Sequence, residues 1–110
     1  MDKKQTLNAL SALGHEGRLE IFRLLVRTAP TGMNAGDIAA ALDIRANTLS
    51  ASLTVLANAG LVTSEREGRH IRYRADLDMM RGLMAFLLED CCGGSPALCQ
   101  PVLDEIACRC

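Results

Sequence analysis

The sequence predicts a mainly α-helical domain that carries one β-hairpin. Two observations support this prediction. Residues 33–42 and 44–59 read as two adjacent helices, because apolar residues in the second recur at positions 49, 53, 56 and 57, the spacing of one helical face. Residues 61–75 then read as two short strands around Glu67 and Gly68. A helix-turn-helix followed by a hairpin is the arrangement of a winged helix-turn-helix domain.

Two further helices are predicted before this motif. Residues 4–13 carry leucines at positions 7, 10 and 13, a short apolar stripe with little of its own domain to cover. Residues 14–17 break this helix, and His15 is expected to start the next one rather than to bind a metal. Residues 18–27 predict a strongly buried helix through six apolar side chains: Leu19, Ile21, Phe22, Leu24, Leu25 and Val26.

The central motif is bounded by residues that favour turns and helix ends. Pro30 and Gly32 mark residues 28–32 as a loop. Asn34 is a candidate N-cap for the helix that runs to residue 42, and Gly60 ends the second helix of the pair. These signals define where the first helix of the pair begins and where the second, the candidate recognition helix, ends; residues 43 and 44 with those that follow supply the turn between them.

The outward face of the candidate recognition helix is polar, which is typical either of a solvated face or of a helix that enters a DNA groove. The arginines of the hairpin favour DNA, since they place positive charge beside this helix. We expect the helix to set base preference and the hairpin to attract phosphates. The predicted DNA-binding residues are Arg45, Asn47, Thr48, Ser50, Ala51, Ser52, Thr54, Arg66, Arg69 and Arg72, with Arg74 nearby in the hairpin.

The distribution of charge agrees with this prediction. The net charge of the chain is −1, but residues 45–74 hold five basic and two acidic side chains, whereas residues 75–110 hold two basic and six acidic ones. Because phosphate attraction depends on local charge, the region expected to meet DNA is the positive one.

Residues 76–90 predict a helix that starts at Asp76 and forms a dimer core. A chain of 110 residues buries a modest core by itself, so a subunit interface is a reasonable source of further burial. We therefore expect a homodimer. The apolar residues that indicate this helix are Leu77, Met80, Leu83, Met84, Leu87 and Leu88.

All five cysteines lie after residue 90. The sequence shows no signal peptide and no stretch long enough to span a membrane, so we expect a cytoplasmic protein with reduced thiols and no membrane partner. An odd number of cysteines favours ligands or reactive thiols over a disulfide framework, although incidental thiols in a tail remain an alternative.

Cys91, Cys92 and Cys99 form the candidate metal site. Residues 93–96 include two glycines and a proline that can turn the chain back, so the three thiolates can converge. Three sulfur ligands without histidine or carboxylate suit a pyramidal centre such as As(III) better than tetrahedral zinc. Cys108 and Cys110 could form a second soft site, replace one ligand or lie free in solvent.

The sequence also resembles the ArsR/SmtB family of dimeric winged-helix repressors. Three motifs carry the resemblance, at residues 10–25, 48–62 and 68–74, and together it covers about residues 5–90. The chain departs from the family where many members have histidines, at Ala51 and Ser52, and a basic residue near Thr54. The resemblance implies a recognition helix with fewer charged contacts to its operator.

Two inducer sites of the family are absent from this sequence. The best-known arsenic-sensing members carry a cysteine pair where this chain has Asn34 and Gly36. Zinc- or nickel-sensing members place Asp and His ligands along the helix where residues 76–90 have no histidine. A subset of arsenic-responsive relatives instead uses a vicinal cysteine pair and a later cysteine at the end of the dimer helix. That pattern resembles Cys91, Cys92 and Cys99.

The sequence thus predicts a DNA-binding transcriptional repressor that is released from operator DNA when As(III) binds the thiolates. The inducer would be arsenite, with antimonite, which supplies Sb(III), as a second candidate. Residues 1–90 would form the winged-helix and dimerisation domain, and residues 91–110 the inducer-binding segment. A sensor of Cd(II), Pb(II) or Cu(I) and a thiol redox or persulfide sensor are the alternatives. No nucleophile is paired with a base and an anion-binding loop, so we expect neither an enzyme nor an organic cofactor.

Overall fold

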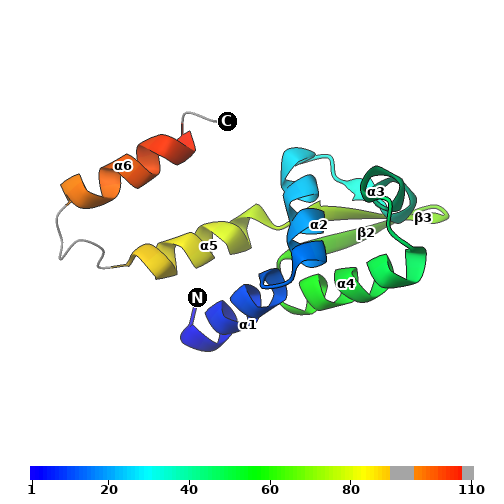
Figure 1. Ribbon diagram of the computed structural model, residues 1–110, viewed down its shortest axis with the longest axis horizontal. Coiled ribbons are helices and arrows are strands. Elements are labelled where there is room, and N and C mark those ends of the chain that lie inside the picture. Colours follow the sequence, from blue (N-terminus) through cyan, green and yellow to red (C-terminus); the bar gives the residue numbers. More distant parts are fainter. Residues whose placement is uncertain (90–95, 108–110) are drawn as a thin grey trace.

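The computed structural model describes residues 1–89 and 96–107, which form helices around a small antiparallel sheet (Figure 1). The predicted mainly α fold with a hairpin wing is confirmed. In chain order the elements are α1 (Lys3–Leu13), α2 (Glu16–Arg27), β1 (Met33–Asn34), α3 (Ala35–Leu42), α4 (Ala46–Asn58), β2 (Val62–Glu67), β3 (His70–Ala75), α5 (Leu77–Leu88) and α6 (Pro96–Ala107).

Side-chain caps fix where three of the helices begin. His15, Asn34 and Asp76 each accept a hydrogen bond from the backbone N–H three residues further on, at 3.3, 2.8 and 3.0 Å. Each cap satisfies a backbone donor that the helix itself leaves open, which typically contributes about 1 kcal/mol. The predicted helix starts at these three residues are therefore confirmed, including the structural role of His15.

The helix-turn-helix consists of α3, a tight turn and α4. Asp43 follows α3 with φ of 52°, the left-handed conformation that reverses the chain after a helix. The backbone N–H of Ile44 then bonds to the carbonyl of Ala39 at 3.1 Å. This turn directs α4 away from α3 and leaves one face of α4 uncovered.

The core lies between α2, α3, α4 and the inner side of the hairpin. Leu49, Leu53 and Leu56 of α4 are buried as predicted, but Ala57 is exposed, because it follows Leu56 by about 100° around the helix and points off the buried face. The prediction for α2 was also too broad. Ile21, Phe22 and Leu25 are buried, and Leu24 is half-buried. Leu19 and Val26 remain 42% and 39% exposed, since they lie on the other side of α2.

The sheet has the strand order β1-β3-β2, so β3 is its central strand. The sequence predicted a helix from residue 33, whereas Met33 and Asn34 form a short strand and the helix begins at Ala35. Met33 pairs with Tyr73 of β3, forty residues further along the chain. Local helical spacing cannot reveal such a long-range pairing, and it explains the difference.

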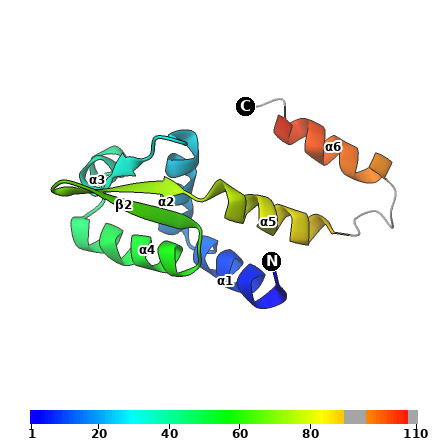
Figure 2. The same ribbon diagram turned by 180° about the vertical axis from the view of Figure 1, so that it is seen from behind.

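α1 and α5 lie on the side of the sheet away from the hairpin tip (Figures 1 and 2), and several of their apolar side chains are exposed. α1 turns its small residues toward its own domain, and Leu7 and Leu10 remain 59% and 40% exposed. In α5 only Leu83 is buried among the described residues, while Leu77 and Leu87 are 46% and 49% exposed. The expectation that these stripes exceed what one domain covers is confirmed.

The chain after α5 differs from the sequence prediction. α5 ends at Leu88 rather than at Asp90, which lies outside the described residues. α6 was not predicted. It contains Pro101, which lacks an N–H and is a helix breaker by local rules. Pro96, in contrast, occupies the first position of α6, where proline is favoured. No helix within residues 1–89 and 96–107 has the length and hydropathy that crossing a membrane requires.

Candidate nucleic-acid interface

The outward face of α4 is a ridge of small and polar side chains. The three buried leucines of α4 fix its inner side. A helix turns by about 100° per residue, so residues three or four positions apart share one face. The face farthest from the core is the one opposite the buried leucines. It holds Asn47, Ala51, Thr54 and Asn58, all exposed. Such a ridge is narrow enough for a major groove and offers donors and acceptors to base edges.

Hydrogen bonds within α4 order two side chains of this ridge. The Asn47 Oδ1 atom accepts the backbone N–H of Thr48 at 2.9 Å, and the Thr54 hydroxyl donates to the carbonyl of Ser50 at 2.9 Å. The Asn47 amide keeps both N–H donors, and the Thr54 oxygen keeps its acceptor capacity. The two residues therefore present opposite hydrogen-bonding character along the ridge.

Arg45 stands at the start of α4 and is exposed. It occupies the N-cap position, but its side chain makes no capping hydrogen bond. The guanidinium thus remains available to a phosphate group at the end of the helix that would enter a groove.

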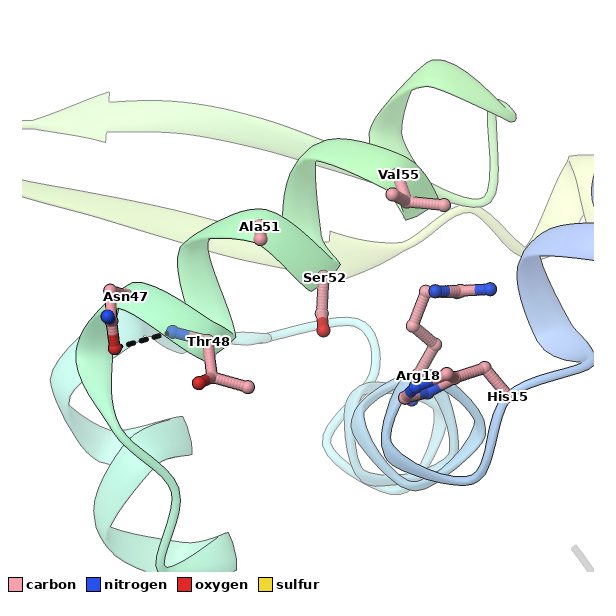
Figure 3. A pocket seen from close by; sticks show the side chains of 7 residues that line it. All are labelled: His15, Arg18, Asn47, Thr48, Ala51, Ser52 and Val55. Carbon is pink, nitrogen blue, oxygen red and sulfur yellow. Dashed lines mark hydrogen bonds between the residues drawn. The ribbon is translucent and has the colours of Figure 1, made fainter.

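Two surface hollows flank the ridge. On the hairpin side, a hollow of about 220 Å³ lies between Ser50 and Thr54 of α4 and Ser64 and Tyr73 of the sheet. On the other side, a hollow of about 440 Å³ separates α4 from the first turn of α2 (Figure 3). We call the larger one the α2–α4 hollow; it is lined by His15, Arg18, Asn47, Thr48, Ala51, Ser52 and Val55.

The hairpin that forms the wing has a two-residue loop. Glu67 of β2 pairs with His70 of β3, which leaves Gly68 and Arg69 at the tip. Gly68 has φ of 63°, a conformation that glycine adopts without steric cost and that tight hairpin loops require. The predicted hairpin is therefore confirmed, with its turn one residue later than predicted, since Glu67 ends β2 and Arg69 is the second loop residue.

Two arginines of the wing are engaged within the protein. Arg72 Nε donates to Glu67 Oε1 at 2.8 Å and its Nη1 to the Gly32 carbonyl at 3.2 Å. Arg74 Nη1 donates to Glu65 Oε2 at 2.8 Å, and its Nε donates to the carbonyl of residue 30 at 3.1 Å. Each of these two arginines therefore connects the wing to the loop before β1. The bond from Arg72 also holds the pKa of the Glu67 carboxyl below its ordinary value.

Arg66 and Arg69 behave differently. Within the part of the chain that the structure describes, neither side chain makes an ion pair or a hydrogen bond. Strand alternation places Arg66 on the same side of the hairpin as Ser64 and Tyr73, which line the hollow beside α4. The wing therefore presents two uncompensated positive charges, one at the tip and one on the side of α4.

The predicted thiol site lies largely outside the described residues. Cys91, Cys92, Cys108 and Cys110 fall outside them, and Cys99 falls within the range of α6 without a described side chain. Among the side chains that the structure describes, no group of three or more His, Cys, Asp or Glu residues could hold a metal ion. The assignment of Cys91, Cys92 and Cys99 stays a prediction.

Sequence reasoning missed the part that α2 plays beside the recognition helix. His15 and Arg18 line the same hollow as Ser52, although more than thirty residues separate them in the chain. Arg18 also ties α1 to α2, because its Nε donates to the carbonyl of Ala12 at 2.7 Å. No local pattern signals this proximity, which arises only when α2 packs against α4.

Comparison with known proteins gives the same architecture. A family model described as a helix-turn-helix domain matches residues 13–65. The biofilm growth-associated repressor of Agrobacterium fabrum is 39% identical over 90 residues, which cover 79% of this chain and 74% of that protein. The matched segment contains both the helix pair and the wing.

Three solved structures are similar to this chain. An ArsR-like transcriptional regulator from Rhodococcus is 28% identical, with a TM-score of 0.70 and coverage of 94% of this chain and 93% of that one. A homodimeric winged helix-turn-helix DNA-binding domain from Mycobacterium bovis is 30% identical, with a TM-score of 0.65 and coverage of 94% and 82%. The AntR antimony-specific transcriptional repressor is 29% identical, with a TM-score of 0.57 and coverage of 72% and 70%.

The recognition helix, its polar ridge and the arginine-bearing wing define a winged helix-turn-helix protein that binds DNA. The similarities to known proteins also identify the family: the chain belongs to the ArsR family of transcriptional regulators.

Proposed function

We propose that this protein is a transcriptional repressor that binds operator DNA as a homodimer and is released when trivalent arsenic or antimony binds its C-terminal thiolates. The observation that carries the DNA-binding part is the exposed ridge of α4 beside the free arginines Arg66 and Arg69. Bases would be read by the ridge, and phosphates would be held by the wing. Such a repressor works beside the chromosome, in the cytoplasm.

Exposed apolar surface supports the homodimer. Leu7 and Leu10 of α1 and Leu87 of α5 are 59%, 40% and 49% exposed, although a monomer gains nothing from leaving such side chains in water. Their burial between two copies would contribute roughly 1–2 kcal/mol for each side chain. A symmetric dimer would present two α4 helices to half-sites about 34 Å apart. The relative from Mycobacterium bovis is itself described as homodimeric.

The placement of the cysteines supports the inducer. No cysteine occurs in residues 1–90, so any thiolate site of this chain must use the segment that follows α5. Cys91 and Cys92 come directly after the helix proposed to form the dimer core. Three thiolates without nitrogen or oxygen ligands suit a soft, pyramidal ion. The similar AntR repressor is named as antimony-specific, which is compatible with this class of inducer.

Release from DNA follows from linkage between the two sites. An inducer that binds the dimer more tightly off DNA must weaken the DNA affinity by the same factor. A coupling free energy of about 1–3 kcal/mol corresponds to roughly 5–150-fold and is sufficient to empty an operator. Ion binding after α5 can produce this coupling by moving the C-terminal end of α5. Because α5 of both subunits forms the proposed interface, such a movement would alter the separation or tilt of the two α4 helices.

An absorption titration of the reduced protein tests the inducer directly. Arsenite and antimonite should give sulfur-to-ion charge-transfer bands that saturate at one ion per subunit. Cadmium, lead and copper titrations run in parallel, and tighter binding of one of these would identify the protein as a sensor of that ion instead. Loss of free thiols with mild oxidant or polysulfide, together with release of DNA and no response to any ion, would indicate a redox or persulfide sensor.

A further inference from the structure

The α2–α4 hollow lies beside the face of α4 that would enter DNA. Thr48, Ser52 and Val55 of α4 line it from positions next to the ridge, and Asn47 and Ala51 of the ridge form its edge. His15 and Arg18 form the opposite side, at the first turn of α2 (Figure 3). The hollow is thus bounded by two helices, only one of which the DNA-binding prediction includes.

The chemistry of the hollow favours an anion. Its polar side chains are one guanidinium, one imidazole, one amide and two hydroxyls, all of which can donate hydrogen bonds. None of the lining residues is acidic. In Figure 3 the Ser52 hydroxyl projects from α4 toward α2, on the side where His15 and Arg18 lie.

The cap that His15 forms fixes which of its nitrogens can donate. Nδ1 accepts the backbone N–H of Arg18 at 3.3 Å, so this nitrogen carries no proton. A neutral imidazole must then carry its proton on Nε2. No described residue accepts a hydrogen bond from that atom. His15 therefore combines a structural role through one nitrogen with a free N–H donor on the other.

The dimensions of DNA indicate what the hollow would meet. A major groove is about 12 Å wide, and a helix with its side chains has a diameter of about 10–12 Å. A helix seated in the groove brings the surfaces on both of its sides against the two sugar-phosphate backbones. The wing lies on one side of α4, and the α2–α4 hollow lies on the other.

We propose that the α2–α4 hollow holds a backbone phosphate of operator DNA, with His15 Nε2–H and Arg18 Nη1 as donors from the start of α2. The Nε and Nη2 atoms of Arg18 bond to the carbonyls of Ala12 and Ser11, which leaves Nη1 for the phosphate. The inference rests on DNA binding through α4 and adds a second helix to the interface. Ser52 would then contribute to this phosphate contact as well as to base preference. Because phosphates occur in every sequence, the contact would support operator and non-specific DNA equally.

His15→Asn separates this role from the cap. Asparagine is a favoured N-cap and can accept the Arg18 N–H, but it is too short to place a donor where Nε2 lies. The variant should melt at the wild-type temperature and bind DNA more weakly by about tenfold for each protomer, the usual effect of losing a hydrogen bond to a charged group. Anisotropy with a fluorescein-labelled duplex of mixed sequence measures this, and a duplex selected from a random library should show the same factor.

Arg18→Gln and Arg23→Gln form a matched pair. Both remove one positive charge from α2, but Arg23 is exposed and does not line the hollow. Arg18→Gln should lower the slope of log affinity against log salt by about 0.9 for each protomer, and Arg23→Gln should leave it near the wild-type value. Since Arg18 also bonds to Ala12, His15→Asn provides the test that does not depend on that contact.

The proposal would be overturned if His15→Asn bound DNA with wild-type affinity. It would also be overturned if folded Arg18→Gln and Arg23→Gln showed equal slopes of log affinity against log salt. An effect of His15→Asn on the selected duplex alone would also contradict it, because a phosphate contact carries no sequence information. If the wild type bound neither duplex, DNA binding through α4 itself would fail, and the two failures are thereby distinguished.

Discussion

Arg72 donates its Nε–H to the Glu67 carboxylate at 2.8 Å, diagonally across the two strands of the wing. The same guanidinium reaches the carbonyl of Gly32, in the loop before β1. One side chain thus connects the two strands near the tip to the loop that leads into the third strand of the sheet. The sequence shows four arginines in the hairpin, and this pair, with Arg74 and Glu65, divides them into two that brace the wing and two that remain free.

This division predicts different salt dependence for the two kinds of arginine. Arg66→Ala and Arg69→Ala should each lower the slope of log affinity against log salt by about 0.9 per protomer, because each removes a charge available to phosphate. Arg72→Ala should change the slope less, since its charge is already offset by Glu67. Anisotropy at several salt concentrations measures the slopes. Equal slopes for Arg69→Ala and Arg72→Ala would show that the brace opens on DNA.

The same ion pair predicts a pH dependence of wing stability. The pKa of Glu67 is lowered in the folded protein from an ordinary value of 4.5, chiefly by the hydrogen bond from Arg72. A lowered folded-state pKa means that the pair stabilises the fold above pH 4.5 and that this contribution is lost as pH falls through the folded-state pKa. Thermal melts should therefore converge for wild type and Glu67→Gln in acid. A carboxyl titration of Glu67 with a midpoint above 4.5 would contradict the pairing.

Gly32 and Gly68 give a paired prediction for stability. Gly32 has φ of 78°, and a Cβ there would collide with the backbone carbonyl of Tyr73, whereas Gly68 has φ of 63° and open space around it. Gly68→Ala should cost about 1 kcal/mol of unfolding free energy through backbone strain alone. Gly32→Ala should cost distinctly more, because β1 must also move away from β3. Urea unfolding of both variants measures this order, and its reversal would mean that the loop before β1 adapts freely.

Much of the fold follows from local sequence signals. The caps His15, Asn34 and Asp76 and the hairpin loop at Gly68 were predictable, because each depends on residues within about four positions. β1 was not predictable in this way, since its two residues are extended only through pairing with Tyr73 and Arg72. α6 was not predicted, and the proline in its interior is a residue that local rules count against a helix.

The interface shows the same limit. The exposed residues of α4 follow from helical periodicity once the buried leucines are recognised. The bracing role of Arg72 does not, because its partner Gly32 is forty residues away. The approach of His15 to Ser52 likewise depends on how α2 packs against α4. Contacts between distant segments therefore decide which of several similar polar residues are free to bind DNA.

Leu10→Glu should disrupt the proposed homodimer. Leu10 in α1 and Val26 in α2 are 40% and 39% exposed, so a charge at either position costs the monomer a similar amount. Only Leu10 lies on the stripe proposed to pack against the partner, where a buried carboxylate would be unpaired. Light scattering should find Leu10→Glu monomeric and Val26→Glu dimeric at micromolar concentration. A dimer in both variants would place the interface elsewhere.

Serine variants test the assignment of the thiolates. Serine is a harder and poorly ionised ligand, so Cys91→Ser, Cys92→Ser and Cys99→Ser should each bind DNA as the wild type does but lose release by arsenite. Cys108→Ser and Cys110→Ser should respond nearly as the wild type does and serve as matched controls. If Cys99→Ser still released DNA while Cys108→Ser or Cys110→Ser did not, the third ligand would be one of the last two cysteines.

The most direct test of the account is the affinity of the reduced protein for a duplex selected from a random library, measured by anisotropy with and without arsenite. We predict tight binding that depends on Asn47 and Thr54 of α4, and a fall in affinity of roughly 5–150-fold when one ion per subunit is bound. Unchanged affinity at saturating arsenite and antimonite would contradict it, because an inducer that binds both states equally cannot regulate an operator.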